Sequence, residues 1–347
     1  WVSLVFAAAI LGLGAVAAVV HSRTASLKTE EITIEGEGYR LWVPAYSEEV
    51  EIVYSEYNEE TDWDWTYASG FGDANIVKGK DVFYARLQDY IYICDIENEE
   101  LIPLCNRPDC LHNEETDASK RAECGAYVPA GRISGCLQYY NGKLYANAYD
   151  KVDGSGFYGD YIYELALDGS GRKLTPVACE NSQSILVHRG RVYYCSKWED
   201  YEAGLTIYEA REVPLKGGDY RVIARLEREV SEGSMDICPC GDCVYVNVTV
   251  GDRFLVYDME RQATGVRETG KEIHSLYPAG REIYAFSHER VDAESEEITL
   301  PIQGATQLYV LDVDGNNLTE LGMLPNGDME LLGLETMVGG KSPDLSL

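Results

Sequence analysis

The sequence predicts an all-β fold: a β-propeller of about six blades, preceded by one N-terminal hydrophobic helix. Three observations point to this fold. A short glycine–aliphatic–aromatic pattern recurs along the chain at intervals of roughly 40–50 residues, the period of a propeller blade. The chain holds 26 tyrosines and 33 glycines, as expected for many short strands joined by turns. A long apolar run stands at the N-terminal end.

The N-terminal run, residues 1–20, contains no charged residue and no proline. About 20 apolar residues are enough to cross a bilayer, and His21 and Arg23 end the run. We therefore interpret residues 1–22 as a transmembrane signal-anchor, with a cleaved signal peptide as the alternative. A buried core helix fits less well, because the segment is terminal and apolar on all faces. The expected location is the cell membrane, crossed once, with the propeller outside; secretion is the alternative.

The repeated pattern is a glycine in a turn, a short spacer, an aliphatic residue and then an aromatic one. Asn141-Gly142 is a strong signal for a two-residue hairpin turn, since both residue types tolerate positive φ. We expect five units within about residues 77–324, and a sixth could begin at residues 329–334. The copies of the pattern start at Gly79, Gly142, Gly190, Gly241 and Gly280.

A second strand follows each copy, as in Tyr90–Ile93 and Tyr161–Glu164, and most units add another strand after a turn. Three or four antiparallel strands per unit match a propeller blade. One blade alone leaves its faces and edges exposed, so neighbouring blades must cover them. A β-sandwich is the alternative fold, but it would not give five similar units. We assign residues 23–76 to a linker with strands that could close a blade, and residues 77–347 to the propeller.

The charge of the chain is strongly negative, with 59 acidic residues, 29 basic residues and a net charge of −30. Such a field repels nucleic acid and anionic membrane surfaces. We therefore expect no nucleic-acid partner, and contact with a membrane only through the N-terminal segment. The field would attract cations or basic peptides, but solubility of an exposed protein explains it most simply.

One cluster of cysteines and a histidine, in an insert at residues 105–124, carries the clearest chemical signal. Cys105, Cys110, His112 and Cys124 supply three sulfurs and one imidazole, the ligand types that suit tetrahedral Zn²⁺. A polar loop lacks a core of its own, and a metal would replace the missing apolar burial. With four protein ligands the site would be closed, and therefore structural rather than catalytic.

Two alternatives to the zinc site remain open at this point. The even number of cysteines in an exported chain fits disulfides, and Cys105–Cys124 or Cys110–Cys124 would staple the loop and leave His112 as an ordinary loop residue. Unpaired thiols without a ligand role are the other alternative. A second group, Cys238, Cys240 and Cys243, overlaps a predicted blade turn and indicates a local hairpin bridge or inert thiols.

The run DIENEELIPLCNRPDCLHNEETDASKRAECGAY, followed by YYNGKLYANAY, resembles uncharacterised propeller proteins of anaerobic Gram-positive bacteria. Those are membrane-anchored or lipoprotein chains with a C-x4-C-x-H…C-x-A-Y insert between the first two blades, and they are similar to TolB-like propellers. The resemblance covers about residues 77–325. It implies a propeller fold and an extracytoplasmic location, with no established activity. The chain departs from the pattern by a longer loop before Cys124 and by the cysteines at 238, 240 and 243.

A non-catalytic binding or scaffold module at the cell surface is the function that these features favour. Its partner would be a protein or glycan of the cell envelope, contacted through blade-rim loops. The alternatives are a glycan-active hydrolase or lyase and a sensor ectodomain. No G-x-S-x-G, Walker or H-E-x-x-H motif is present in the sequence, and no catalytic residue can be named. Trp63, Trp65 and Trp198 could stack on sugar rings.

Overall fold

A computed structural model describes residues 29–46, 58, 74–80, 82–129, 137–151, 158–179, 181–229, 235–248, 253–271, 273, 275–279, 282–288, 306–312 and 318–324. The N-terminal hydrophobic segment, residues 1–22, lies outside the described residues. The expected start of a sixth blade, residues 329–334, also lies outside them. Within the described ranges, no helix has the length and apolarity needed to cross a membrane.

The described strands form five four-stranded antiparallel units, which we call blades 1 to 5. Blade 1 contains β3 (Ala74–Lys78), β4 (Phe83–Leu87), β5 (Tyr90–Asp95) and β6 (Glu100–Pro103). Blade 2 contains β7 (Leu137–Tyr140), β8 (Lys143–Lys151), β9 (Tyr158–Leu165) and β10 (Arg172–Cys179). Blade 3 contains β11 (Ser182–His188), β12 (Arg191–Asp200), β13 (Leu205–Pro214) and β14 (Arg221–Arg228). Blade 4 contains β15 (Met235–Cys240), β16 (Cys243–Val248), β17 (Arg253–Asp258) and β18 (Ala263–Glu268). Blade 5 contains β19 (Ser275–Ala279), β20 (Glu282–His288), β21 (Thr306–Asp312) and β22 (Leu318–Leu324).

In blades 1 to 4, the glycine of the repeated pattern lies between the first two strands of the blade. In blade 2, Asn141 and Gly142 have φ of 48° and 71°, so this turn takes the positive-φ form that matches strand twist in a tight hairpin. Gly190 and Gly241, at the same place in blades 3 and 4, also have positive φ. The pattern therefore marks the first hairpin of a blade.

Successive blades pack face to face. The alternation along β16 shows why: Val244 and Val246 lie in a core cluster shared with blade 3, while Cys243 and Tyr245 lie in one shared with blade 5. Because side chains alternate across a strand, burial on both faces gives a run in which all six residues of β16 are buried. Four core clusters fill the four junctions between consecutive blades.

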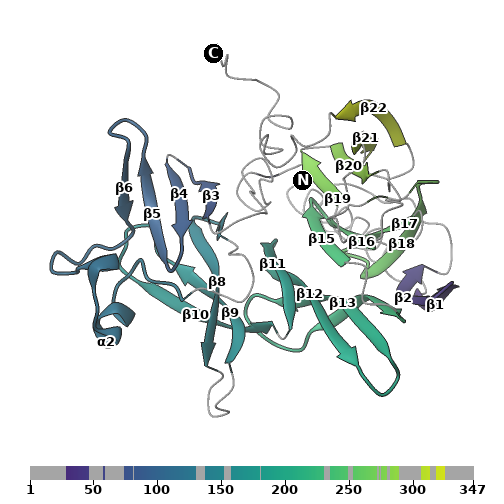
Figure 1. The fold of residues 1–347 in the computed structure, drawn as a ribbon, viewed down its shortest axis with the longest axis horizontal. Helices are drawn as coiled ribbons and strands as arrows, with labels where there is room; N and C mark the ends of the chain where they lie inside the picture. The colour runs from purple at the N-terminus through teal and green to yellow at the C-terminus, as the bar shows by residue number, and fades with distance from the viewer. Residues whose placement is uncertain are drawn as a thin grey trace, which may run out of the picture.

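The blades follow one another in an arc, from blade 1 in dark blue to blade 5 in yellow (Figure 1). Antiparallel sheets that pack in this serial way are the arrangement of propeller blades. The prediction of an all-β fold is confirmed. Because the described residues contain five blades, a total of about six stays a prediction.

The segment before blade 1 contributes a hairpin, β1 (Thr29–Gly36) and β2 (Tyr39–Tyr46). The second strand, β2, also pairs with β14 through residues 39–42, and its Ala45 pairs with Thr264 of β18. The hairpin therefore lies between blades 3 and 4 and joins them into one ten-stranded sheet.

Candidate metal centre

The insert that follows β6 connects blade 1 to blade 2, and its ends pack into the core between them. Its two helices are short: η2 (His112–Glu114) and α2 (Ala118–Ala122). Neither helix contains a buried residue. The ends of the insert behave differently, because Leu104, Ala126 and Val128 lie in the core between blades 1 and 2. The insert is thus anchored at its ends and has no apolar core in its middle.

Backbone hydrogen bonds fix both ends of the insert to blade 1. The amide of Leu104 donates to the carbonyl of Ile91 at 2.9 Å, and the amide of Ile91 donates to Ala126 at 2.9 Å. The amide of Val128 donates to the carbonyl of Asp89 at 2.7 Å. These bonds bring residues 104 and 126 to neighbouring places, although 21 residues separate them in the chain.

Local turns then direct the ligand side chains. The side chain of Asp117 caps α2 by accepting from the amides of Ser119 and Lys120, which is the preferred way to satisfy the first turn of a helix. Cys124 follows directly, with its amide bonded to the carbonyl of Arg121 at 3.1 Å. His112 has a φ of 52°, an uncommon conformation for a residue with a side chain, and such positions cluster at functional sites.

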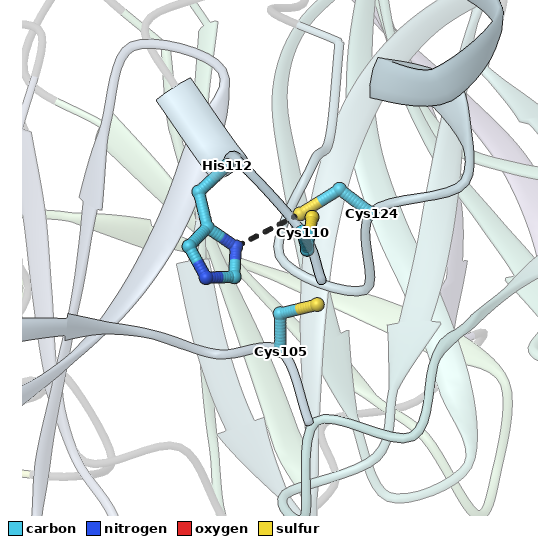
Figure 2. Close-up of side chains that lie close together, drawn as sticks. All are labelled: Cys105, Cys110, His112 and Cys124. Carbon is cyan, nitrogen blue, oxygen red and sulfur yellow. Dashed lines mark hydrogen bonds between the residues drawn. The ribbon is translucent and has the colours of Figure 1, made fainter. Parts of the chain in front are cut away.

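The four residues named from the sequence converge on one point (Figure 2). The ligand atoms of Cys105, Cys110, His112 and Cys124 all lie within 4.8 Å of one another. The Nδ1 atom of His112 is 3.7 Å from the Sγ atom of Cys124. With Zn–S bonds of about 2.3 Å and Zn–N bonds of about 2.0 Å, tetrahedral geometry places two ligand atoms about 3.5–3.8 Å apart. The donor set and its spacing therefore fit a metal ion.

The pKa values of Cys105 and Cys124 are shifted in opposite directions. Burial raises the pKa of Cys105, but backbone hydrogen bonds from Arg107 and Gly125, together with the neighbouring thiols, outweigh it and bring the pKa below its usual value. Burial raises the pKa of Cys124 to about 12, and the adjacent Cys110 and Cys105 add to that rise. A cation at the centre would remove this repulsion, because it favours the thiolate form of each ligand.

Blade 2 holds the other side of the cluster through Arg172 at the start of β10. Its guanidinium donates to the carbonyl of Cys124 at 2.6 Å and to that of Ala122 at 2.7 Å. The same guanidinium lies over the rings of Tyr127 and Tyr163, at 5.5 and 5.3 Å from their centroids. From blade 1, the hydroxyl of Tyr90 donates to the carbonyl of His112 at 3.0 Å. Side chains from both blades therefore hold the backbone of two ligands, Cys124 and His112.

A close approach of two backbones completes the junction. The amide of Asn106 donates to the carbonyl of Gly169 at 3.1 Å. A Cβ atom at Gly125 would lie only 2.6 Å from the same carbonyl oxygen. Glycine at position 125 therefore lets the insert contact the turn between β9 and β10.

The sequence identified all four members of the cluster, but it did not identify Arg172 or Tyr90. Their contacts go to main-chain carbonyls, and Arg172 is 48 residues from Cys124. No sequence pattern predicts a bond from a side chain to a distant main-chain carbonyl. The only local feature at Arg172 is that a basic residue begins a strand just after the Asp168-Gly169 turn.

None of the nine cysteines in the described part of the chain is in a disulfide. Cys240 and Cys243 face each other across the hairpin turn of blade 4. Cys238 and Cys243 are buried, and burial raises the pKa of both thiols. The structure brings no other cysteine, histidine or carboxylate side chains of its described ranges into a metal-binding group with them.

No protein-family model matches the chain, and no curated protein matches it. Among solved structures, it is similar to a protein proposed to be TolB from Agrobacterium tumefaciens, with 13% identity, 78% of this chain and 83% of that chain covered, and a TM-score of 0.38. It is similar to the β-propeller domain of the Trilobed protease from Pyrococcus furiosus, with 12% identity, coverage of 54% and 57%, and a TM-score of 0.35. It is also similar to the β-propeller domain of Cps50 (Swd1) from Myceliophteria thermophila, with 11% identity, coverage of 78% and 89%, and a TM-score of 0.33. The fold assignment itself rests on the strand pairing and the core clusters.

Proposed function

We propose that the chain is a non-catalytic binding or scaffold module of the cell envelope, and that a structural zinc ion fixes the insert between its first two blades. The observation that carries the zinc part of this proposal is the set of four ligands, Cys105, Cys110, His112 and Cys124. A catalytic zinc keeps one coordination position for water or substrate, whereas a structural zinc is fully bound by protein. Thiolate and imidazole donors favour zinc over magnesium or calcium.

The structural role follows from the position of the cluster. Its ligands come from a segment without a core, while the ends of that segment and Arg172 connect it to blades 1 and 2. A metal ion would cross-link Cys105 at the start of the insert to Cys124 near its end. This cross-link would keep Leu104 and Ala126 packed in the core of the junction.

The location outside the cell membrane is part of the proposal and is supported by the apolar run at residues 1–20 and by the net charge of −30. The partner would be an envelope protein or glycan. Surface digestion of intact cells tests the location: an added protease should degrade the propeller without lysis. Protection until the cells are lysed would contradict an external location.

Metal content and free-thiol count of the purified full chain test the zinc site. We expect about one zinc per chain, because the four-ligand set is complete, and loss of that zinc in Cys105→Ser and in His112→Ala. Cys94→Ser is the matched control, since Cys94 is a half-buried cysteine of β5 outside the cluster; it should retain the metal.

Three results would contradict the site. Absence of metal with thiols that react only after reduction would make the insert a disulfide staple. Absence of metal with freely reactive thiols would leave the cluster without a ligand role. Retention of zinc in His112→Ala would remove the histidine from the ligand set.

A further inference from the structure

A cavity of about 430 Å³ lies where the N-terminal hairpin meets blades 3 and 4. Its volume falls in the range of about 300–1,000 Å³ that is typical of small-ligand sites. Its lining combines aromatic, apolar, basic, amide and acidic residues. They are Trp42, Pro44, Val222, Arg221, Arg261, Gln262 and Glu31.

The cavity exists because the hairpin pairs with its neighbours over only part of its length. Pairing of β2 with β14 ends at Trp42, opposite Arg225, and the pairing of β2 with β18 is limited to Ala45 and Thr264. Pro44, between them, has no N–H group to continue a ladder. The first residues of β14 and the turn before β18 therefore border a gap instead of a paired strand.

Neighbouring side chains of the protein hold the guanidiniums of both arginines in place. Arg221 donates to the hydroxyl of Tyr257 at 3.3 Å and lies 3.6 Å from the carboxylate of Glu212. Glu212 is 2% exposed, so this anchor is inside the protein. Arg261 is paired with Asp258 at 3.2 Å. Such fixed donors cost little ordering when a ligand binds.

The charges of the lining are largely compensated by partners. The lining holds two arginines and one glutamate, Glu31. Arg221 contacts Glu212 and Arg261 contacts Asp258, while Glu212 also binds Arg191 at 2.6 Å, so three arginines and three carboxylates are joined in or next to the lining. A neutral patch on a chain of net charge −30 attracts neither an anion nor a cation strongly, which favours an uncharged polar ligand.

The hydrogen-bonding groups indicate which polar ligand fits. Arginine only donates, an ionised glutamate only accepts, and glutamine does both, so Arg261, Glu31 and Gln262 together match groups that donate and accept at once. Hydroxyl groups on a ring have this property. The indole of Trp42 offers a flat apolar face against which the C–H side of such a ring can pack.

We infer that this cavity binds a neutral saccharide, with a sugar ring against Trp42 and its hydroxyls bonded to Arg221, Arg261, Gln262 and Glu31. The inference rests on the proposed binding function and names its ligand class. The site lies at the outer strands of blades 3 and 4, beside the labelled β2 and β18 (Figure 1).

Titration calorimetry of the full chain tests the inference, with maltose, cellobiose and N,N′-diacetylchitobiose as neutral probes and glucuronate as the anionic comparison. We expect one neutral probe to bind with a dissociation constant of about 0.1–1 mM, an affinity in the range of a small ligand held by a few contacts. Trp42→Leu should weaken it about tenfold or more. Trp198→Leu is the matched control, because Trp198 is on β12 and is not part of the cavity wall; binding should be unchanged.

A second variant protects the test against loss of folding in Trp42→Leu. Gln262→Asn leaves the ion pair of Arg261 with Asp258 intact and suits the positive φ of 59° at position 262. It shortens one hydrogen-bonding side chain of the lining, so it should weaken binding about fivefold with little change in melting temperature. No binding by any neutral probe would overturn the saccharide site, as would tighter binding of glucuronate. Binding that survives both variants would overturn this location and leave the proposed binding function standing. Zinc content, measured on the same samples, tests the proposed structural zinc site separately from the proposed binding function.

Discussion

The junction between blades 1 and 2 and the junction between blades 3 and 4 are filled in different ways. At the first, an insert with two short exposed helices adds its ends to an apolar core between the sheets, and its middle is organised around a cluster of three thiols and an imidazole. At the second, the strand β2 continues the sheets themselves, and Leu41, Val43 and Ala45 enter a large apolar core.

These two ways of filling a junction determine where each one is weak. An apolar core distributes its stabilisation over many contacts within one cooperative unit, so removal of a side chain there lowers the stability of the whole unit. A metal site concentrates stabilisation in a few ligand bonds, so removal of the metal or of one ligand opens the segment that they hold and leaves the rest folded. Loss of the ligand cluster should therefore open the insert locally, whereas loss in the core of the second junction should lower the stability of the whole unit.

Leu41→Ala should give the largest loss of global stability. Leu41 is 1% exposed in the core of the second junction, and removal of a buried leucine side chain costs about 2–5 kcal/mol. Chemical denaturation, followed by tryptophan fluorescence, measures it. Leu101→Ala is the control, since Leu101 is 48% exposed on β6; equal losses in the two variants would break the comparison.

Removal of the metal by a chelator should have the second-largest effect, and it should destabilise only the insert. We expect faster hydrogen exchange over residues 104–129, because the cross-link between Cys105 and Cys124 is lost, while β12 and β16 stay protected. Cys110→Ser should reproduce this pattern without a chelator. If exchange increased equally in blades 3 and 4, the local character of the first junction would be refuted.

Arg172→Gln should weaken the first junction by about 1–3 kcal/mol, because two charge-assisted hydrogen bonds to backbone carbonyls are lost. Local exchange of the insert and zinc affinity are the readouts. Arg107→Gln serves as the matched change: Arg107 is an exposed arginine of the same insert, paired with Glu123 at 3.0 Å, and its loss should have a smaller effect. A larger effect at Arg107 would contradict the role of Arg172.

The junction between blades 2 and 3 has an apolar core that contains Tyr194. The stability of this third junction should depend on pH. Burial raises the pKa of Tyr194 from 10.0 to about 12, with Cys179 adding to the rise. Folding thus favours the neutral phenol. The resulting stabilisation is complete below about pH 10 and is lost as the pH rises towards about 12, by at most about 1.4 kcal/mol per pH unit. Tyr194→Phe should show a shallower alkaline fall in unfolding free energy; an identical slope would be evidence against this cause.

Arg40→Ala should have the smallest effect. Arg40 pairs with Glu35 at 3.4 Å on the surface of the hairpin, and the two side chains are 58% and 70% exposed. Exposed ion pairs contribute about 0–1 kcal/mol. Denaturation at low and high salt should give nearly the same difference from the parent chain. A loss comparable with that of Leu41→Ala would show that charge, rather than the core, holds the second junction.

Local patterns predicted the repeated unit well. The glycine pattern found first hairpins because Gly142 and Gly190 need positive φ, which few other residues adopt cheaply. The same locality explains what was missed. Pairing of Ala45 with Thr264 depends on two segments far apart, and no residue of β2 indicates which blade edge it meets.

The candidate sites show the same limit. The metal cluster was predictable because Cys105, Cys110 and His112 are neighbours in the sequence. The cavity was not, since its wall comes from three separate parts of the chain. The sequence instead suggested Trp63 and Trp65, which lie outside the described residues, and Trp198, whose ring packs at 5.3 Å from the guanidinium carbon of an arginine.

The N-terminal hairpin is synthesised long before the strands with which it pairs. Tyr39 of β2 accepts a hydrogen bond at 3.3 Å from Arg253, 214 positions further along the chain. Closing so long a loop costs chain entropy before any pairing compensates for it. During synthesis one edge of β2 therefore stays unpaired until β14 and β18 have formed, so an early-made strand reaches its final pairing late in folding.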